Sequence, residues 1–183
     1  MSFHYWQYFL AIETSLHETT RYVELTSNNY KTYSIEFARI LLSASSEVDV
    51  LCKLLCEKID ITKRNKNMDD YRNIITEKYP NFYSMKVLVP RYGIELTPWE
   101  RWENQENPGW WKSYNKVKHN RNDNFQDANL ENTLVAVAGL FCLVLYYYQQ
   151  ELYGLKLSPW SELLSIEHEP DNITIGKYVL PDF

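Results

Sequence analysis

The longest apolar run in the chain covers residues 134–148 and contains no charged side chain. At 15 residues it is shorter than the roughly 20 residues that a helix needs to cross a bilayer. Its apolar positions occupy most of a helical circumference, so we expect a buried helix over residues 127–152, with no membrane contact, around which the chain packs. The positions that define it are Ala128, Leu134, Val135, Ala138, Phe141, Cys142, Leu145 and Tyr148.

Two earlier segments also repeat apolar residues at helical spacing. Residues 3–25 follow a rough 3.6-residue period, which predicts an amphipathic helix. Residues 34–60 predict a second one, with Ser34 as N-cap. Its apolar stripe consists of Phe37, Leu41, Ala44, Val48, Leu51, Leu55 and Ile59. Glu47 lies at the edge of that stripe, where it is either solvated or, if buried, needs a cationic or hydrogen-bonding partner.

The remaining segments are shorter. Residues 69–79 begin with two aspartates, whose negative charge suits a helix N-terminus. Residues 81–108 alternate apolar and polar side chains around a glycine, which predicts a small hairpin inserted between helices. Residues 109–120 predict a short helix, followed by a turn, NRNDNFQD.

The part after Gly154 is interpreted as an irregular tail, with one short helix over residues 159–166 and an extended end over 173–180. The expected fold class is therefore all-α. We expect a bundle of four to five main helices in a single domain over residues 1–183, with the 81–108 hairpin and the tail as additions.

The net charge restricts which partners the chain can bind, and the cysteine content indicates its redox environment. The net charge is −5, so contact with nucleic acid requires a local basic patch. Three cysteines argue against a disulfide framework and are typical of a reducing cytoplasm. We expect Cys52, Cys56 and Cys142 to be buried thiols. The N-terminus has neither a basic leader nor a small-residue cleavage site, so no secretory signal is predicted.

Most sequence patterns that carry chemistry are missing. The chain has no phosphate-binding glycine loop, no G-x-S-x-G, no H-E-x-x-H and no paired-cysteine zinc spacing, so we expect neither a cofactor nor a metal. Of the four histidines, only His119 lies among many polar and cationic residues.

The segment YNKVKHNR, residues 114–121, is the candidate site. On a helix, Asn115 and His119 share a face with Trp111 or Lys112. Imidazole acts as an acid or a base near neutral pH, and lysine or arginine stabilises phosphoryl oxygens. The candidate catalytic residues are His119, Asn115 and Arg121, and the candidate substrate-binding residues are Lys112, Tyr114, Lys116, Lys118 and Trp111. Such a group either cleaves RNA without a metal or only holds a phosphate; the remaining interpretation is a solvated basic turn before a core helix.

Two features together resemble the HEPN superfamily: the helix texture ARILLSASSEVDVLCKLL, and YNKVKH directly before a long apolar helix. The resemblance covers roughly residues 30–60 and 109–152. It implies an all-α bundle that forms a homodimer. Many members are metal-independent ribonucleases of bacterial defence, toxin–antitoxin or RNA-processing systems. It assigns the family's catalytic histidine to His119 and the polar residue after its arginine to Asn115.

Tyr114 stands where the family has that arginine, and a tyrosine supplies no permanent cation to a scissile phosphate. This departure and the acidic net charge favour a non-catalytic or weakly active module that binds RNA, a nucleotide or a protein partner. A second hypothesis is a dimeric endoribonuclease with His119 as acid and base. A third is an antitoxin-like or structural helical protein that buries its aromatic surface against a cognate chain.

Overall fold

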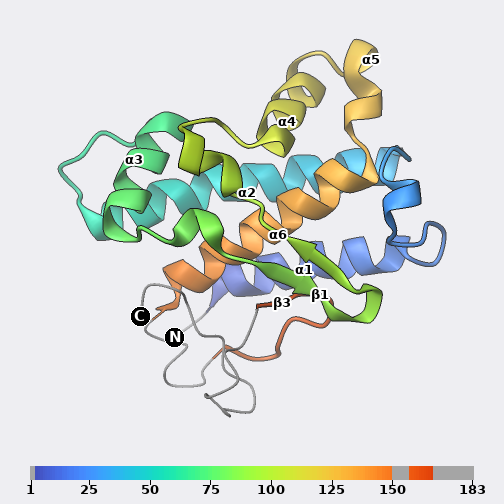
Figure 1. Cartoon of the computed structure of the whole chain (residues 1–183), viewed down its shortest axis with the longest axis horizontal. Helices are drawn as coiled ribbons and strands as arrows, with labels where there is room; N and C mark the ends of the chain where they lie inside the picture. The colour runs from blue at the N-terminus through green and yellow to red at the C-terminus, as the bar shows by residue number, and fades with distance from the viewer. Residues whose placement is uncertain (1–2, 150–156, 167–183) are drawn as a thin grey trace.

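The computed structural model describes residues 3–149 and 157–166 (Figure 1). These residues are mostly helical, with one small antiparallel sheet. The helices are α1 (His4–Thr19), α2 (Ile35–Ile59), α3 (Met68–Lys78), α4 (Gly109–His119), α5 (Arg121–Asn124) and α6 (Leu130–Tyr147). The strands are β1 (Val87–Val89), β2 (Ile94–Leu96) and β3 (Ser165–Ile166), in the spatial order β2-β1-β3.

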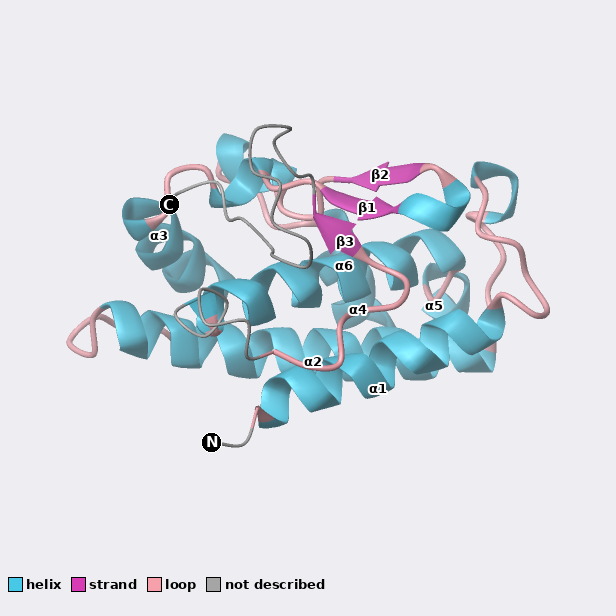
Figure 2. Cartoon of the chain, turned by 90° about the horizontal axis from the view of Figure 1, so that it is seen from below, coloured by secondary structure: helices cyan, strands magenta, loops and turns pink. Residues whose placement is uncertain are grey.

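Helix α6 is the centre of the molecule, as its apolar run predicts. It contacts α1, α2 and α4, and Figure 2 shows the sheet on one side of it and α1 and α2 on the other. Phe141 of α6 stacks on Phe9 of α1, with ring centroids 5.1 Å apart. Among the described helices, α6 alone is long and apolar enough to cross a membrane by length and composition, and most of it is buried inside the bundle.

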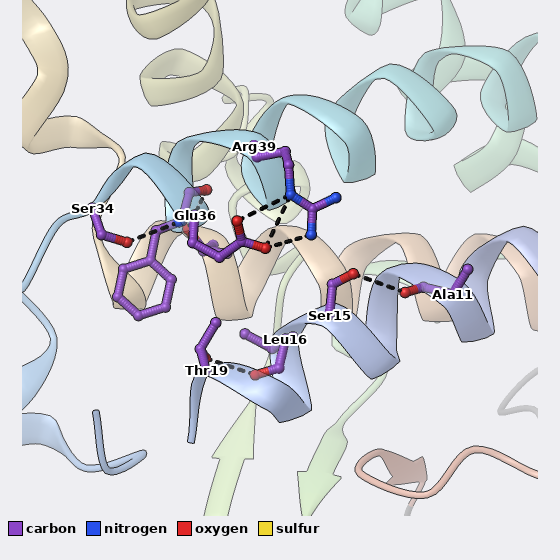
Figure 3. Close-up of polar contacts among 9 residues, drawn as sticks. Ala11, Ser15, Leu16, Thr19, Ser34, Glu36 and Arg39 are labelled. Carbon is purple, nitrogen blue, oxygen red and sulfur yellow. Dashed lines mark hydrogen bonds and ion pairs between the residues drawn. The ribbon is translucent and has the colours of Figure 1, made fainter. Parts of the chain in front are cut away.

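Helix α2 begins where the sequence predicts, because the Ser34 Oγ accepts a hydrogen bond from the Phe37 backbone N–H at 3.0 Å (Figure 3). Its predicted stripe is buried except for Ile59, which is half-buried. Glu47 is half-buried too, and its side chain has no hydrogen bond or ion pair with the residues that the structure describes. Loss of hydration therefore raises the pKa of the Glu47 carboxyl group.

Position 139, in the middle of α6, requires a glycine because the Trp110 side chain of α4 lies close to the backbone there. A Cβ at this position would lie 3.0 Å from the Trp110 ring. The Gly139 carbonyl also accepts a hydrogen bond from the Trp99 indole at 3.2 Å, and the Trp110 indole donates to the Pro98 carbonyl at 2.9 Å. The aromatic segment before α4 is therefore packed onto the central helix rather than displayed to solvent.

The predicted hairpin is present as β1 and β2, with Val87 opposite Leu96 and Val89 opposite Ile94. Its tip contains Gly93, whose φ of 62° lies in the left-handed region that glycine adopts without strain. Strand β3 comes from the tail and pairs with the other edge of β1. The described residues are thus not purely α-helical.

The predicted helix over residues 159–166 is wrong. The buried Glu13 carboxylate takes the backbone N–H groups of Glu162, Leu163 and Leu164 at 3.0–3.1 Å, and it also accepts from the Ser161 hydroxyl. The Pro159 carbonyl accepts from the Trp6 indole at 2.9 Å. Because these backbone groups form hydrogen bonds with side chains of α1, they do not form the backbone hydrogen bonds of a helical turn. The predicted extended end, residues 173–180, lies outside the described residues.

Other boundaries differ by less. Helix α1 ends at Thr19 rather than at residue 25, and α6 begins at Leu130 rather than at residue 127 and ends at Tyr147. Residues 150–152, at the end of the predicted helix, lie outside the described residues. The turn predicted after His119 contains the short helix α5. The three cysteines are buried and free, as expected, and burial raises the pKa of each thiol, in Cys56 to about 12.

Candidate nucleic-acid interface

Helix α4 carries the predicted site and has one buried face. Trp110, Tyr114 and Val117 follow one another at a spacing of three or four residues and all lie in the core. The helix packs on α2 and α6 through this face. Figure 1 shows α4 and α5 together on one side of the bundle.

The opposite face of α4 is exposed and cationic. Lys112, Lys116 and His119 are exposed and share this face, because they are separated by three, four or seven residues. Lys118, one turn after Tyr114 at the edge of the buried face, and Arg121 in α5 are exposed as well. We call these five residues the α4 cationic face.

Tyr114 and His119 lie on different sides of the same helix. Five residues correspond to about 140° of helical rotation. Tyr114 is 5% exposed, whereas His119 is exposed. A residue at position 114 therefore cannot act on a substrate together with His119 of the same chain while α4 keeps this packing.

The other two candidate catalytic residues, Asn115 and Arg121, make no hydrogen bond to His119. The Asn115 amide donates to the Trp111 carbonyl of its own helix at 3.0 Å. The side chains of His119 and Arg121 have no hydrogen bond or ion pair with any residue that the structure describes. Among the described residues, no side chain orients the His119 imidazole in the way that a catalytic triad orients its histidine.

Among the residues that the structure describes, a carboxylate neutralises one member of the α4 cationic face. Lys116 Nζ lies 3.2 Å from the Asp127 carboxylate. Lys118 Nζ lies 5.3 Å from the centroid of the Tyr114 ring, a cation–π contact. Lys112, like Arg121, makes no ion pair within the described part of the chain. Their charges are available to an anion from solution.

Trp111 adds an aromatic group at the edge of this surface. It is half-buried, with its ring 5.0 Å from Tyr114 and 5.9 Å from Trp110. Trp111 and Lys118 are seven residues apart and therefore lie on the same side of α4. An aromatic ring beside lysines is the arrangement on which single-stranded nucleic acids stack a base and place a phosphate.

An open groove beside α5 was not predicted. It has a volume of about 530 Å³ and is lined by Ile35, Ala38, Arg39, Leu42, Arg121, Asn122 and Phe125. It contains one predicted residue, Arg121, and not His119. A signal was present in the sequence, because Ile35, Ala38 and Leu42 form a second apolar stripe at i, i+3 and i+7 on α2.

The described residues contain no group of three histidine, cysteine or acidic side chains that would hold a metal ion. Comparisons of the chain with protein-family models, with curated proteins and with solved structures find no match. The resemblance to the HEPN superfamily rests on the helix texture and on YNKVKH alone.

Proposed function

We propose that the chain is a HEPN-like helical module that binds RNA through the α4 cationic face and does not cleave it. The main support for this proposal is that the residues of the motif lie on different sides of α4. The cations of the motif are turned to solvent, and three of the five have neither a carboxylate nor an aromatic partner among the described residues. Tyr114, at the family's arginine position, is buried in the core.

Charge supports a local binding surface. Between residues 109 and 124 the chain has four lysines and arginines and one carboxylate, although its net charge is −5. Polyanions bind to such a patch by displacing counterions, and the rest of an acidic surface limits contact to that patch. Trp111 supplies a ring for a base, which favours single-stranded RNA over a duplex whose bases are stacked inside.

The proposal is tested by measuring the affinity of a fluorescently labelled single-stranded RNA at several salt concentrations. We expect the double variant Lys112→Gln/Lys118→Gln to bind about tenfold more weakly at low salt and to lower the salt slope by about two. The matched control is Lys66→Gln/Lys78→Gln, because both lysines are exposed near the ends of α3 and make no ion pair with described residues.

Equal weakening by both double variants would mean that only net charge matters, and would contradict a site on α4. Unchanged affinity in the α4 variant would contradict it as well. Folding of each variant is checked from its unfolding midpoint, which these exposed substitutions should leave within about 0.5 kcal/mol of the parent.

A further inference from the structure

The groove between α2 and α5 is chemically different from the α4 cationic face. Its floor is aliphatic and aromatic, formed by Ala38, Leu42 and Phe125. Ile35, at the first turn of α2, stands at its edge with 80% of its surface exposed. Single exposed apolar residues are ordinary, but a stripe that continues for two turns beside an open groove is typical of a binding surface.

The groove is held in shape by fixed contacts. Phe125 meets Tyr33, in the segment before α2, with ring centroids 5.4 Å apart. The backbone N–H of Leu130 donates to the Thr32 carbonyl at 2.9 Å, which ties the start of α6 to the start of α2. A partner would therefore find a preformed surface and would not have to order it.

The residues that line the groove include two arginines, Arg39 and Arg121, and no carboxylate. Arg121 has no hydrogen bond or ion pair with the described residues. Arg39 is held by Glu36 one turn away on α2, and Figure 3 shows their charged ends facing each other. Asp123 of α5 is not among the lining residues, and its carboxylate accepts from the Asn120 amide at 2.7 Å. The charge of the lining itself is therefore positive, with Arg121 as its unpaired cation.

We infer that this groove docks an amphipathic helix of a partner protein, whose apolar side chains lie on Ile35, Leu42 and Phe125 and whose flanking carboxylates meet Arg121. A second copy of the chain fits less well, because a two-fold contact places the same lining, with its arginines and no carboxylate, on both sides of the interface. RNA fits less well because the floor is aliphatic and offers a base few polar partners.

The experiment uses two labelled model peptides of about 15 residues, both with leucines at helical i, i+3, i+4 and i+7 spacing. One carries glutamates at the flanking positions and the other carries lysines. Fluorescence anisotropy with the full chain should show at least tenfold tighter binding of the glutamate peptide. Arg121→Gln should reduce that preference, because it removes the unpaired cation.

Two matched substitutions locate the binding. Ile35→Ser removes the apolar contact at the groove, and we expect about tenfold weaker binding of the glutamate peptide. Ile61→Ser is the control, because Ile61 is 81% exposed and lies past the other end of α2. Equal binding of the two peptides, or equal effects of the two substitutions, would overturn the proposal.

Two further results would also overturn the docking proposal, because each would assign the groove to a different ligand. In sedimentation, a dimer of the parent chain that Ile35→Ser dissociates would assign the groove to a second copy. In the RNA assay, a loss caused by Ile35→Ser equal to that of the α4 double variant would make the groove part of the RNA surface. Because Ile35 is outside the α4 cationic face, failure of the docking proposal leaves the RNA proposal standing, and the reverse also holds.

Discussion

Helices α4 and α6 pack against each other, yet they divide their side chains between core and solvent differently. Nearly every residue of α6 from Leu134 onward is buried, so its composition is explained by packing. In α4 only Trp110, Tyr114 and Val117 are buried, and the cations face outward. The comparison shows that a motif spread around an amphipathic helix is split by the fold into a structural half and an accessible half.

The largest expected effect is on the α6 side of this comparison. Phe141→Ala removes a fully buried ring that packs on Phe9, and the cavity should lower the free energy of unfolding by about 4 kcal/mol. Lys112→Ala in α4 should change it by less than about 0.5 kcal/mol. Urea unfolding measures both. A cost below about 1 kcal/mol for Phe141→Ala would contradict the central position of α6.

The second prediction concerns the position at which the family has an arginine. Tyr114→Arg should destabilise the chain by about 3 kcal/mol, because it buries an unpaired cation beside Val117 and Trp110. Tyr114→Phe keeps the ring and should cost less than about 1 kcal/mol, since the phenol has no hydrogen-bond partner among the described residues. Thermal unfolding followed by circular dichroism separates the two. A Tyr114→Arg variant as stable as the parent would show that position 114 reaches solvent.

The third prediction tests the contact between the two helices. Gly139→Val should cost about 2 kcal/mol, because its added carbons would overlap the Trp110 ring, which a Cβ alone already approaches to 3.0 Å. Gly109→Ala, where a Cβ meets nothing within 4 Å, should change stability by less than about 0.5 kcal/mol. Equal effects of the two substitutions in chemical unfolding would mean that Trp110 does not pack on α6.

The smallest expected effect lies on α2, which contacts both helices. Burial raises the pKa of Glu47, so the folded chain is penalised for ionising this group. The penalty is absent well below the ordinary pKa of 4.5 and develops as the pH rises above it. Glu47→Gln should therefore leave stability unchanged at pH 3 and increase it by about 0.5 kcal/mol at pH 7, a small value because the carboxylate keeps solvent contact.

Urea unfolding of Glu47→Gln and the parent at the two pH values measures this difference. Glu57→Gln, at an exposed position of the same helix, is the control and should show no such change. A Glu47 variant that is less stable than the parent at pH 7 would point to an attractive partner for the carboxylate.

The sequence predicts helices well where one period dominates. The cap at Ser34, the stripe of α2 and the buried run of α6 are local patterns, and each appears in the structure. The tail could not be predicted this way, because its conformation depends on Glu13, about 150 residues earlier in the chain. A glutamate on the apolar side of a predicted helix gives no local sign of which N–H groups it will bind.

The candidate site was predicted in part. Helical spacing predicts that Asn115 and His119 share a face with Trp111 or Lys112; in the structure Lys112 and His119 are exposed, whereas Asn115 and Trp111 are half-buried. Spacing alone does not say which face of α4 packs on α6, so the burial of Tyr114 and the bond from Asn115 to its own helix were not foreseen. The groove was missed because its two walls, α2 and α5, are about 80 residues apart in sequence.

The most direct test of the central claim combines RNA binding and RNA cleavage in the same samples of the parent chain and of His119→Ala, with a chelator present. We expect both proteins to bind a labelled single-stranded RNA, with affinities within about threefold, and neither to cleave it. Binding in the same tube shows that the protein is folded and active as a module. Cleavage by the parent chain that disappears in His119→Ala would show that the module is a ribonuclease and would assign catalysis to His119.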